Sequence, residues 1–510
     1  MRLLPICLPL QRLILLGLLL CFTWFPTAAL AQPNGSSIQP YIDRVAQQIT
    51  EFQLDNGMKF IVMERHQSPT VSFMTYVDVG SAYEQPGKTG AAHFLEHLAF
   101  KGTRQIGTLN YAAEAPLLAQ LDQLNKQVRA AETNGQSDAA LKQQFEQVQA
   151  KAASYVKQNE FGQIVQRSGG VGLNATTSAD ATQYFYSFPS NKLELWMSLE
   201  SERFLEPVFR EFFEEKDVIL EERRMRTDNS PIGKLIEEFL QVALPDHPYG
   251  RPVIGFESDI RNLERSNIQQ LFDAYYTPDR IIMGIVGDVD PKQVQQLAQA
   301  YFGRYQAQSR APDVVVNAPA QTEPRSVVVN LPSEPWYIEG YQRPALTDPD
   351  DAVYQMIASI LTGGRTARLY RSLVEQQQVA LGVDVASSFP GDRYSNLMLF
   401  FAQTAPGYTI DQVAAALEAE LTRLKTEPVP EAELDQVKTQ ARAGLLQTLA
   451  SNQGMASLLP EYEAKTGSWR NLFEALKAIE AVTAADVQRV ATDLFQPRNQ
   501  TTGKLMAVGG

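Results

Sequence analysis

The chain has 510 residues, of which 44% are hydrophobic, and its formal net charge at pH 7 is −13. This length allows two or more domains with substantial cores. The acidic balance argues against binding to nucleic acid and against binding to anionic membrane surfaces.

Residues 1–31 have the pattern of an export signal. Arg2 and Arg12 flank an apolar run over 13–22, and the small-residue stretch 29–31 is typical of a cleavage site. The apolar run is too short to span a bilayer comfortably. We therefore predict export to the periplasm or the extracellular space, with no stable membrane insertion after cleavage; an uncleaved or lipid membrane anchor is the alternative. Both cysteines lie in this segment, so the mature chain has no disulfide, and losing the two arginines takes the charge from −13 to −15.

Three strands are predicted between Ile49 and Asp78. The stretch "FQLDNGMKFIVMER" contains two alternating runs around a hairpin signal, and "TVSFMTYVDVG" adds a third run. A helix is expected next, because Thr89-Gly90 offers an N-cap and is followed by two alanines.

That helix contains His93-Phe94-Leu95-Glu96-His97, and the whole chain has only four histidines. Positions i and i+4 share a helix face, so the imidazoles of His93 and His97 can point at one site. Two neutral imidazoles and a carboxylate suit Zn²⁺ with an open coordination position. The alternative is an ordinary amphipathic helix with two half-buried histidines, but the order H-x-x-E-H in so histidine-poor a chain favours the metal site.

The surrounding "GAAHFLEHLAFKGT" closely resembles the pitrilysin/insulinase family of metallopeptidases, which includes the mitochondrial processing peptidase and bacterial relatives. The resemblance implies one zinc ion per chain, held by His93, His97 and a glutamate on a later helix that follows another glutamate by seven residues. In "EKDVILEERRM" this implies Glu222 as the third ligand and Glu215 as a supporting carboxylate. Glu221 lies about 100° around the helix and is the less suitable ligand. By itself, the acidic run would fit a solvated helix face.

A helical hairpin is predicted at about 111–158. Apolar residues recur every three or four positions over 117–128 and again over 141–155, on either side of "ETNGQSD". A solvated spacer without a further role is one interpretation of this insertion.

The stretch "GGVGLNATTSADATQYFYSFP" begins with a glycine turn and continues with strand composition. The family resemblance places a substrate-facing strand here, with Asn174 as a substrate-binding residue; the alternative is an asparagine that bonds its own turn. We interpret "HPYGRPVIGFESDI", around His247, as a structural loop.

An internal repeat predicts two related halves. "SNIQQLFDAYYTPDR" from Ser266 aligns without gaps with "ADVQRVATDLFQPRN" from Ala485, and each is followed by a strand-like run. We expect an α+β fold with a zinc-bearing half over 40–308, a linker over 309–324 and a metal-free half over 325–510, which contains no histidine. The resemblance implies that the two α/β halves face each other across a chamber.

The leading hypothesis is an exported zinc endopeptidase that hydrolyses unstructured peptides. Zinc would lower the pKa of a bound water, and Glu96 would act as the general base. The alternatives are a non-catalytic assembly or scaffold subunit and an exported peptide-binding protein of the same fold.

The resemblance also concerns a partner. In this family the metal-free half commonly supplies an arginine and, seven residues later, a tyrosine that hold the substrate. The matching positions here are Val374 and Leu381, which cannot donate a hydrogen bond. We predict that a related second subunit supplies the pair in a heterodimer, with a homodimer, or a local replacement by Arg371 or Tyr370, as alternatives.

Overall fold

The computed structural model describes residues 39–135, 138–306, 311–316 and 320–507. The predicted signal segment and part of the predicted linker lie outside these residues. Within the described ranges, every helix is too short or too polar to cross a membrane. The first helix is α1 (Gln39–Gln47).

The first half is built on a mixed six-stranded sheet with strand order β1-β2-β6-β3-β5-β4. Only the β2–β6 pair is parallel. The central strand β6 is buried along its whole length and β3 is buried after its first residue, whereas β4, at one edge, has mainly alternating exposed and half-buried residues. The strands are β1 (Ile49–Gln53), β2 (Lys59–Glu64), β3 (Thr70–Val77), β4 (Val171–Thr177), β5 (Thr182–Pro189) and β6 (Ile281–Gly287).

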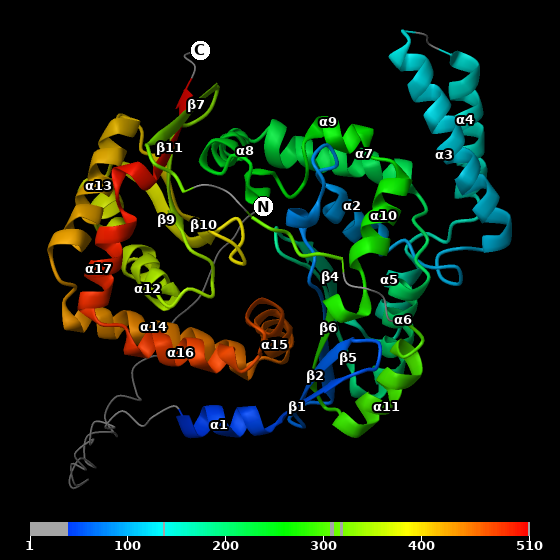
Figure 1. Cartoon of the computed structure of the whole chain (residues 1–510), viewed down its shortest axis with the longest axis horizontal. Coiled ribbons are helices and arrows are strands. Elements are labelled where there is room, and N and C mark those ends of the chain that lie inside the picture. The colour runs from blue at the N-terminus through cyan, green and yellow to red at the C-terminus, as the bar shows by residue number, and fades with distance from the viewer. Residues whose placement is uncertain (1–38, 136–137, 307–310, 317–319, 508–510) are drawn as a thin grey trace, which may run out of the picture. The chain divides into compact units, whose positions relative to one another are not determined.

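Helices connect the strands of this half (Figure 1). They are α2 (Ala91–Leu98), α5 (Glu160–Arg167), α6 (Leu193–Leu205), α7 (Phe212–Arg223), α8 (Pro231–Ala243), α9 (Glu257–Asn262), α10 (Arg265–Tyr275) and α11 (Pro291–Phe302). The three strands predicted before the histidine helix correspond to β1, β2 and β3.

The second half repeats the topology. Its sheet has the order β7-β11-β8-β10-β9, which matches β2-β6-β3-β5-β4 strand for strand, including the one parallel pair. The aligned sequence repeat corresponds to α10–β6 and α17–β11. The predicted α+β fold with two related halves is therefore confirmed. The elements are β7 (Arg325–Leu331), β8 (Trp336–Arg343), α12 (Asp351–Thr362), β9 (Ala380–Phe389), β10 (Asn396–Thr404), α13 (Ile410–Thr426), α14 (Glu431–Ala450), α15 (Asn452–Thr466), α16 (Asn471–Ala481), α17 (Ala484–Leu494) and β11 (Gln500–Ala507).

Each half contributes one helix to the sheet of the other. Helix α15 packs on β3 and β6, and α8 packs on β7 and β11 (Figure 1). Two glycines at the same position of the repeat make room for this exchange. A Cβ at Gly284 would lie 2.2 Å from the carbonyl oxygen of Ala456 in α15, and a Cβ at Gly503 would lie 3.1 Å from the ring of Phe239 in α8. The exchange holds the two sheets together through side-chain packing and not through the linker alone.

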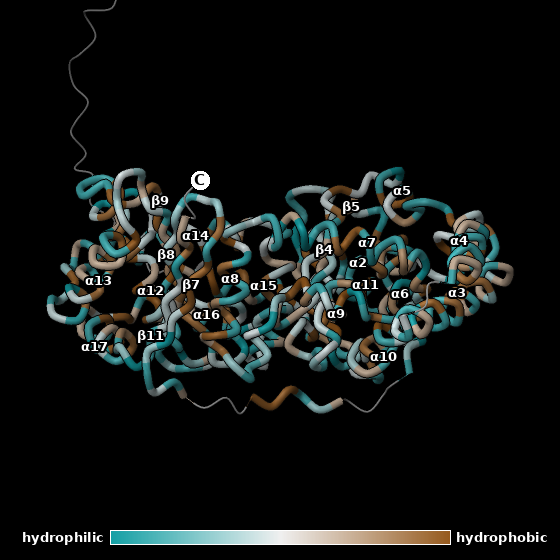
Figure 2. Tube along the Cα trace, turned by 90° about the horizontal axis from the view of Figure 1, so that it is seen from above, coloured by the Kyte–Doolittle hydropathy of each residue, from teal (hydrophilic) through white to brown (hydrophobic). Residues whose placement is uncertain are grey.

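The predicted helical hairpin is formed by α3 (Tyr111–Thr133) and α4 (Ala139–Ala153). Figure 2 views this hairpin nearly end-on, and its turns include both hydrophilic and hydrophobic residues. Its buried apolar residues include Leu117, Leu121 and Leu124 of α3 and Val148 of α4, which is the spacing of one apolar stripe on a helix. The hairpin does not satisfy its own apolar faces completely, because Val208 and Phe213 also pack into its cluster. At its base, Arg210 forms a fully buried ion pair with Glu114 (Nε–Oε1 2.8 Å). The insertion is thus anchored directly beside the start of α7.

Candidate metal centre

The N-terminus of α2 is capped by a residue that the sequence did not indicate. Gly90 takes a left-handed conformation (φ +87°), and its neighbour Thr89 donates its hydroxyl to Asp259 (2.7 Å) instead of capping the helix. The buried carboxylate of Glu84 accepts hydrogen bonds from the backbone N–H groups of Gly90 (3.0 Å) and Ala92 (2.7 Å). The helix therefore begins at the predicted place, with Gly90 as the N-cap residue, but the acceptor for its free N–H groups is Glu84 and not the side chain of Thr89.

The segment around His247 also supports this helix. A Cβ at Gly90 would lie 2.6 Å from the carbonyl oxygen of Ile254, and one at Gly255 would lie 2.5 Å from that of Thr89, so the two backbones are in direct contact. His247 is buried, and its Nδ1 accepts a hydrogen bond from the N–H of Tyr249 (2.9 Å). These contacts agree with the interpretation of this segment as a structural loop.

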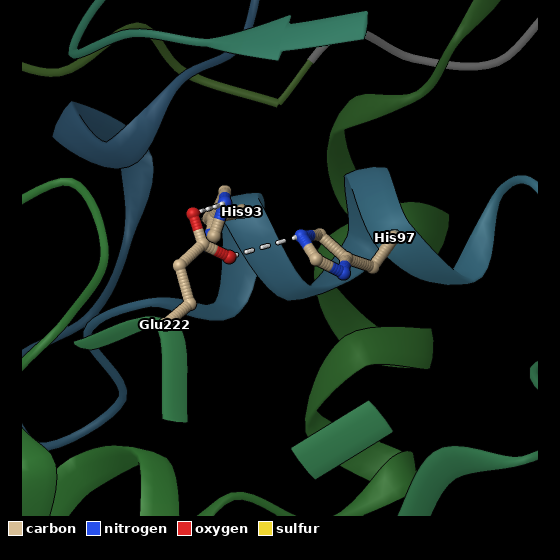
Figure 3. Close-up of side chains that lie close together, drawn as sticks. All are labelled: His93, His97 and Glu222. Atoms are coloured by element: carbon tan, nitrogen blue, oxygen red, sulfur yellow. Dashed lines mark ion pairs between the residues drawn. The ribbon is translucent and has the colours of Figure 1, made fainter. Parts of the chain in front are cut away.

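Three side chains from two helices converge on one point (Figure 3). His93 and His97 lie on α2, and Glu222 lies near the end of α7. One ligand atom of each lies within 4.8 Å of the others. The His93 Nε2–Glu222 Oε1 distance is 3.7 Å, and the His97 Nε2–Glu222 Oε2 distance is 3.5 Å.

These residues fit a zinc ion. Ligand atoms about 2.0–2.2 Å from one tetrahedral zinc lie about 3.3–3.6 Å from one another, close to the 3.5 Å and 3.7 Å that separate Glu222 from the two histidines. Two imidazoles and a carboxylate also form the donor set of open zinc sites.

The pKa values of the two histidines are shifted in opposite directions. Burial and the neighbouring His97 lower the pKa of His93 to about 4, so this imidazole is neutral. Burial also disfavours a charged His97, but hydrogen bonds with Glu215 and Glu222 outweigh it and raise the pKa of His97 to about 9. A proton on His97 therefore competes with a metal for the site.

Glu215 contacts the imidazole nitrogen of His97 that faces away from Glu222. Its Oε2 lies 3.2 Å from Nδ1 of His97, and its other oxygen forms an ion pair with Lys101. Because Nδ1 is occupied by this contact, Nε2 is the nitrogen that faces Glu222. Glu221, in contrast, has a side chain that is 53% exposed and pairs with Arg224.

A π-helical turn, η3 (Arg224–Asp228), follows directly after the acidic helix. It places Arg226 with its Nη1 2.7 Å from Oε1 of Glu222. The sequence analysis did not identify Arg226, although its place four residues after Glu222 is the usual spacing of a helical ion pair.

Glu96 borders the cluster without belonging to it. Its Oε2 accepts a short hydrogen bond from Oγ1 of Thr177 (2.5 Å), the last residue of β4. Burial raises the pKa of the Glu96 carboxyl, and the Thr177 hydrogen bond partly opposes this effect. Thr177 was missed as well; the one available signal was its place three residues after Asn174.

Asn174 is exposed on the edge strand β4, and its Oδ1 accepts a hydrogen bond from the N–H of Ala175 (2.9 Å). This contact corresponds to the alternative of an asparagine bonding its own turn. In the metal-free half, Val374 packs against the core, and Leu381 is 54% exposed. Arg371 lines a surface cavity of about 560 Å³ whose lining residues all come from that half. Tyr370 is half-buried and begins the π-helical segment Tyr370–Gln376, which also contains Arg371.

Comparisons with known proteins agree on one family. The insulinase (peptidase family M16) model matches residues 59–136, and the peptidase M16 inactive domain model matches residues 262–441. The zinc protease PqqE of Helicobacter pylori is 28% identical over 456 residues, covering 88% of this chain and 90% of that protein.

Two solved structures show the same fold. A protease from Helicobacter pylori superimposes with a TM-score of 0.76 at 27% identity, covering 90% of this chain and 99% of that chain. The periplasmic protease PqqL from Escherichia coli superimposes with a TM-score of 0.65 at 18% identity, covering 91% of this chain and 48% of that chain.

Proposed function

We propose that this chain, which belongs to the insulinase (M16) family of zinc proteases, is an exported endopeptidase that hydrolyses unstructured peptides or protein segments. The observation that carries the proposal is the convergence of His93, His97 and Glu222 beside the carboxylate of Glu96, which is not one of the converging ligands. Neither a scaffold subunit nor a binding protein needs a general base next to a complete set of ligands.

In this proposal His93, His97 and Glu222 hold one zinc ion. When bound, the ion would supply Lewis acidity, which would lower the pKa of a water molecule and polarise the scissile carbonyl. Glu215 holds the proton on Nδ1 of His97 and so keeps Nε2 available as a ligand.

Glu96 is the proposed general base. Its carboxylate removes a proton from the attacking water and returns that proton to the nitrogen of the leaving amine. The Thr177 hydrogen bond occupies Oε2, which leaves Oε1 to accept the proton.

The edge strand β4 supports the choice of an extended substrate. An edge strand offers unpaired backbone groups to a peptide, and β4 contacts the histidine helix α2. Asn174 is exposed on this strand, where it can contact a peptide after releasing its bond to Ala175.

Export rests on residues 1–31, and the fold relative PqqL is described as periplasmic. The proposed division into a metal-bearing half (40–308), a linker (309–324) and a metal-free half (325–510) agrees with the two sheets. A heterodimeric partner is proposed because Val374 and Leu381 offer no donor, while the cavity that Arg371 lines has no residue from the metal-bearing half.

The test of the mechanism is Glu96→Gln. The amide keeps the size of the side chain but cannot accept the proton, so zinc content should stay at one per chain while peptide cleavage is lost. Turnover close to wild type at full zinc content would remove Glu96 from the mechanism. Loss of the metal would instead show that Glu96 is a ligand.

The test of the partner compares the chain purified alone with material co-purified from its native source. We expect weak cleavage by the isolated chain and strong cleavage by the complex. High turnover of the isolated monomer, unchanged by any co-purifying protein, would contradict the heterodimer. High turnover of an isolated dimer would favour the homodimer.

A further inference from the structure

We propose that Thr177 positions the general base Glu96, and that a loop of the metal-free half, residues 391–394, holds Thr177 in place through the turn between β4 and β5. This inference rests on the proposed role of Glu96 as the base. It assigns the metal-free half a part in the chemistry that does not depend on contact with the substrate.

The first contact is between the hydroxyl of Thr177 and the base. Oγ1 donates to Oε2 of Glu96 at 2.5 Å, and Thr177 pairs with Thr182 at the closed end of the β4–β5 hairpin. A carboxylate on a two-carbon side chain has several rotamers, and a general base must lie within hydrogen-bond reach of the water proton. The hydroxyl restricts Glu96 to one of these positions.

The hairpin turn that follows Thr177 is rigid. The hydroxyl of Ser178 accepts hydrogen bonds from the N–H groups of Asp180 (3.2 Å) and Ala181 (3.1 Å). On one side the backbone of the turn is held by Ser81, whose N–H donates to the carbonyl of Ser178 (3.1 Å). A displacement of Asp180 would therefore be transmitted to Thr177, three residues away.

The other side of the turn is held by the metal-free half. Asp180 is 2% exposed, and its Oδ2 accepts hydrogen bonds from the backbone N–H groups of Asp392 (2.9 Å) and Arg393 (3.3 Å). Its Oδ1 accepts from the hydroxyl of Tyr249. A Cβ at Gly391 would lie 2.6 Å from Oδ2 of Asp180, so the loop backbone sits directly against the carboxylate.

The loop itself is anchored at two further points. Arg393 forms an ion pair with Asp78, just after β3, and Lys465 of α15 lies with its Nζ 2.7 Å from Oδ1 of Asp392. These pairs are largely buried, with exposed fractions of 15% or less for Arg393, Asp78 and Lys465. The loop therefore has a fixed position from which to hold the turn.

The contacts form a continuous path from the loop through Asp180 and the turn to Thr177 and Glu96. A purely structural role would also explain why the loop packs on Asp180. If the path only stabilises the fold, removing the hydroxyl of Thr177 without disturbing the fold should leave turnover unchanged. If the path positions Glu96, the same change should lower turnover.

The experiment compares Thr177→Val, which keeps the shape of the side chain, with Thr177→Ser, which keeps the hydroxyl. We expect Thr177→Val to lower kcat by about ten- to a hundredfold, with KM, zinc content and Tm unchanged, and Thr177→Ser to restore most of the turnover. An unchanged kcat in Thr177→Val would overturn the proposal, as would an equal loss in both variants.

The loop is tested by a double-mutant cycle. Asp180→Ala should lower kcat in the wild-type background and have no further effect in the Thr177→Val background, because both act on Glu96 by one route. Additive losses would show that Asp180 acts elsewhere. If Asp180→Ala does not fold, Gly391→Ala takes its place, since the new methyl group would displace the same carboxylate.

Glu96→Gln, measured in parallel, distinguishes the role of Glu96 as the base from the role of Thr177 in positioning it. If the wild type does not cleave peptides, the proposed function itself fails, and if Glu96→Gln keeps its turnover, the proposed role of Glu96 as the base fails. If Glu96→Gln is inactive while Thr177→Val has full activity, only the positioning role fails.

Discussion

Glu215 offers a quantitative test of the metal centre, through the variant Glu215→Gln. Glu215 is 9% exposed and lies 3.2 Å from Nδ1 of His97, so the amide would replace a charged partner by a neutral one at the same place. Partners of metal-bound histidines typically contribute 10–100-fold to metal affinity, which is about 1.4–2.8 kcal/mol. We expect a loss of zinc affinity in this range at a pH where His97 is unprotonated.

The pH dependence gives the prediction a second readout. Without metal the pKa of His97 is raised to about 9, so at neutral pH zinc binding must expel a proton from this residue. The apparent zinc affinity of the wild type should therefore rise about tenfold per pH unit up to about pH 9 and then level off. Glu215→Gln removes one of the two carboxylates that raise this pKa, so its affinity should level off at a lower pH, and its deficit should be smaller at pH 7 than at pH 9.

The assay is competition with a chelator of known zinc affinity between pH 6.5 and 9.5. Glu211→Gln is the matched control, because Glu211 also pairs with Lys101 (3.4 Å) and does not take part in the contact with Nδ1 of His97. It should bind zinc like the wild type. A Glu215→Gln variant with the affinity and the pH profile of the wild type would refute the supporting role of Glu215.

Three further outcomes are expected. Glu222→Gln should lose zinc on gel filtration while Glu221→Gln keeps it, because the Glu221 side chain is 53% exposed and points to Arg224; the reverse result would transfer the ligand role to Glu221. Arg210→Leu leaves Glu114 buried without its partner and should lower the free energy of unfolding by about 3–5 kcal/mol, measured in urea; a loss below about 1 kcal/mol would contradict the buried pair. Gly284→Ala should cost about 1–3 kcal/mol and lower Tm, since its methyl group would lie 2.2 Å from a carbonyl oxygen of α15; an unchanged Tm would show that this contact is loose.

The parts of this protein that could be predicted from its sequence depend on local spacing. Four-residue spacing on a helix brings His93 and His97 together wherever that helix lies. Heptad-like spacing likewise predicted the hairpin of α3 and α4, and the gapless repeat predicted two halves of one topology. Glu222 lies 125 residues after His97, so its approach to the histidines was implied by the family resemblance and not by spacing.

The tertiary structure decided the features that join distant segments. Glu84 caps the histidine helix from a loop, and Thr177 reaches Glu96 from a strand 81 residues away. The exchange of α8 and α15 between the sheets is marked in the sequence only by two glycines, Gly284 and Gly503. A hydroxyl or a carboxylate has the same chemistry in every turn and loop, so its sequence neighbours do not reveal which distant backbone or side chain it will meet. That partner is fixed only when the two sheets pack and bury both groups, because a buried polar group is stable only with a partner.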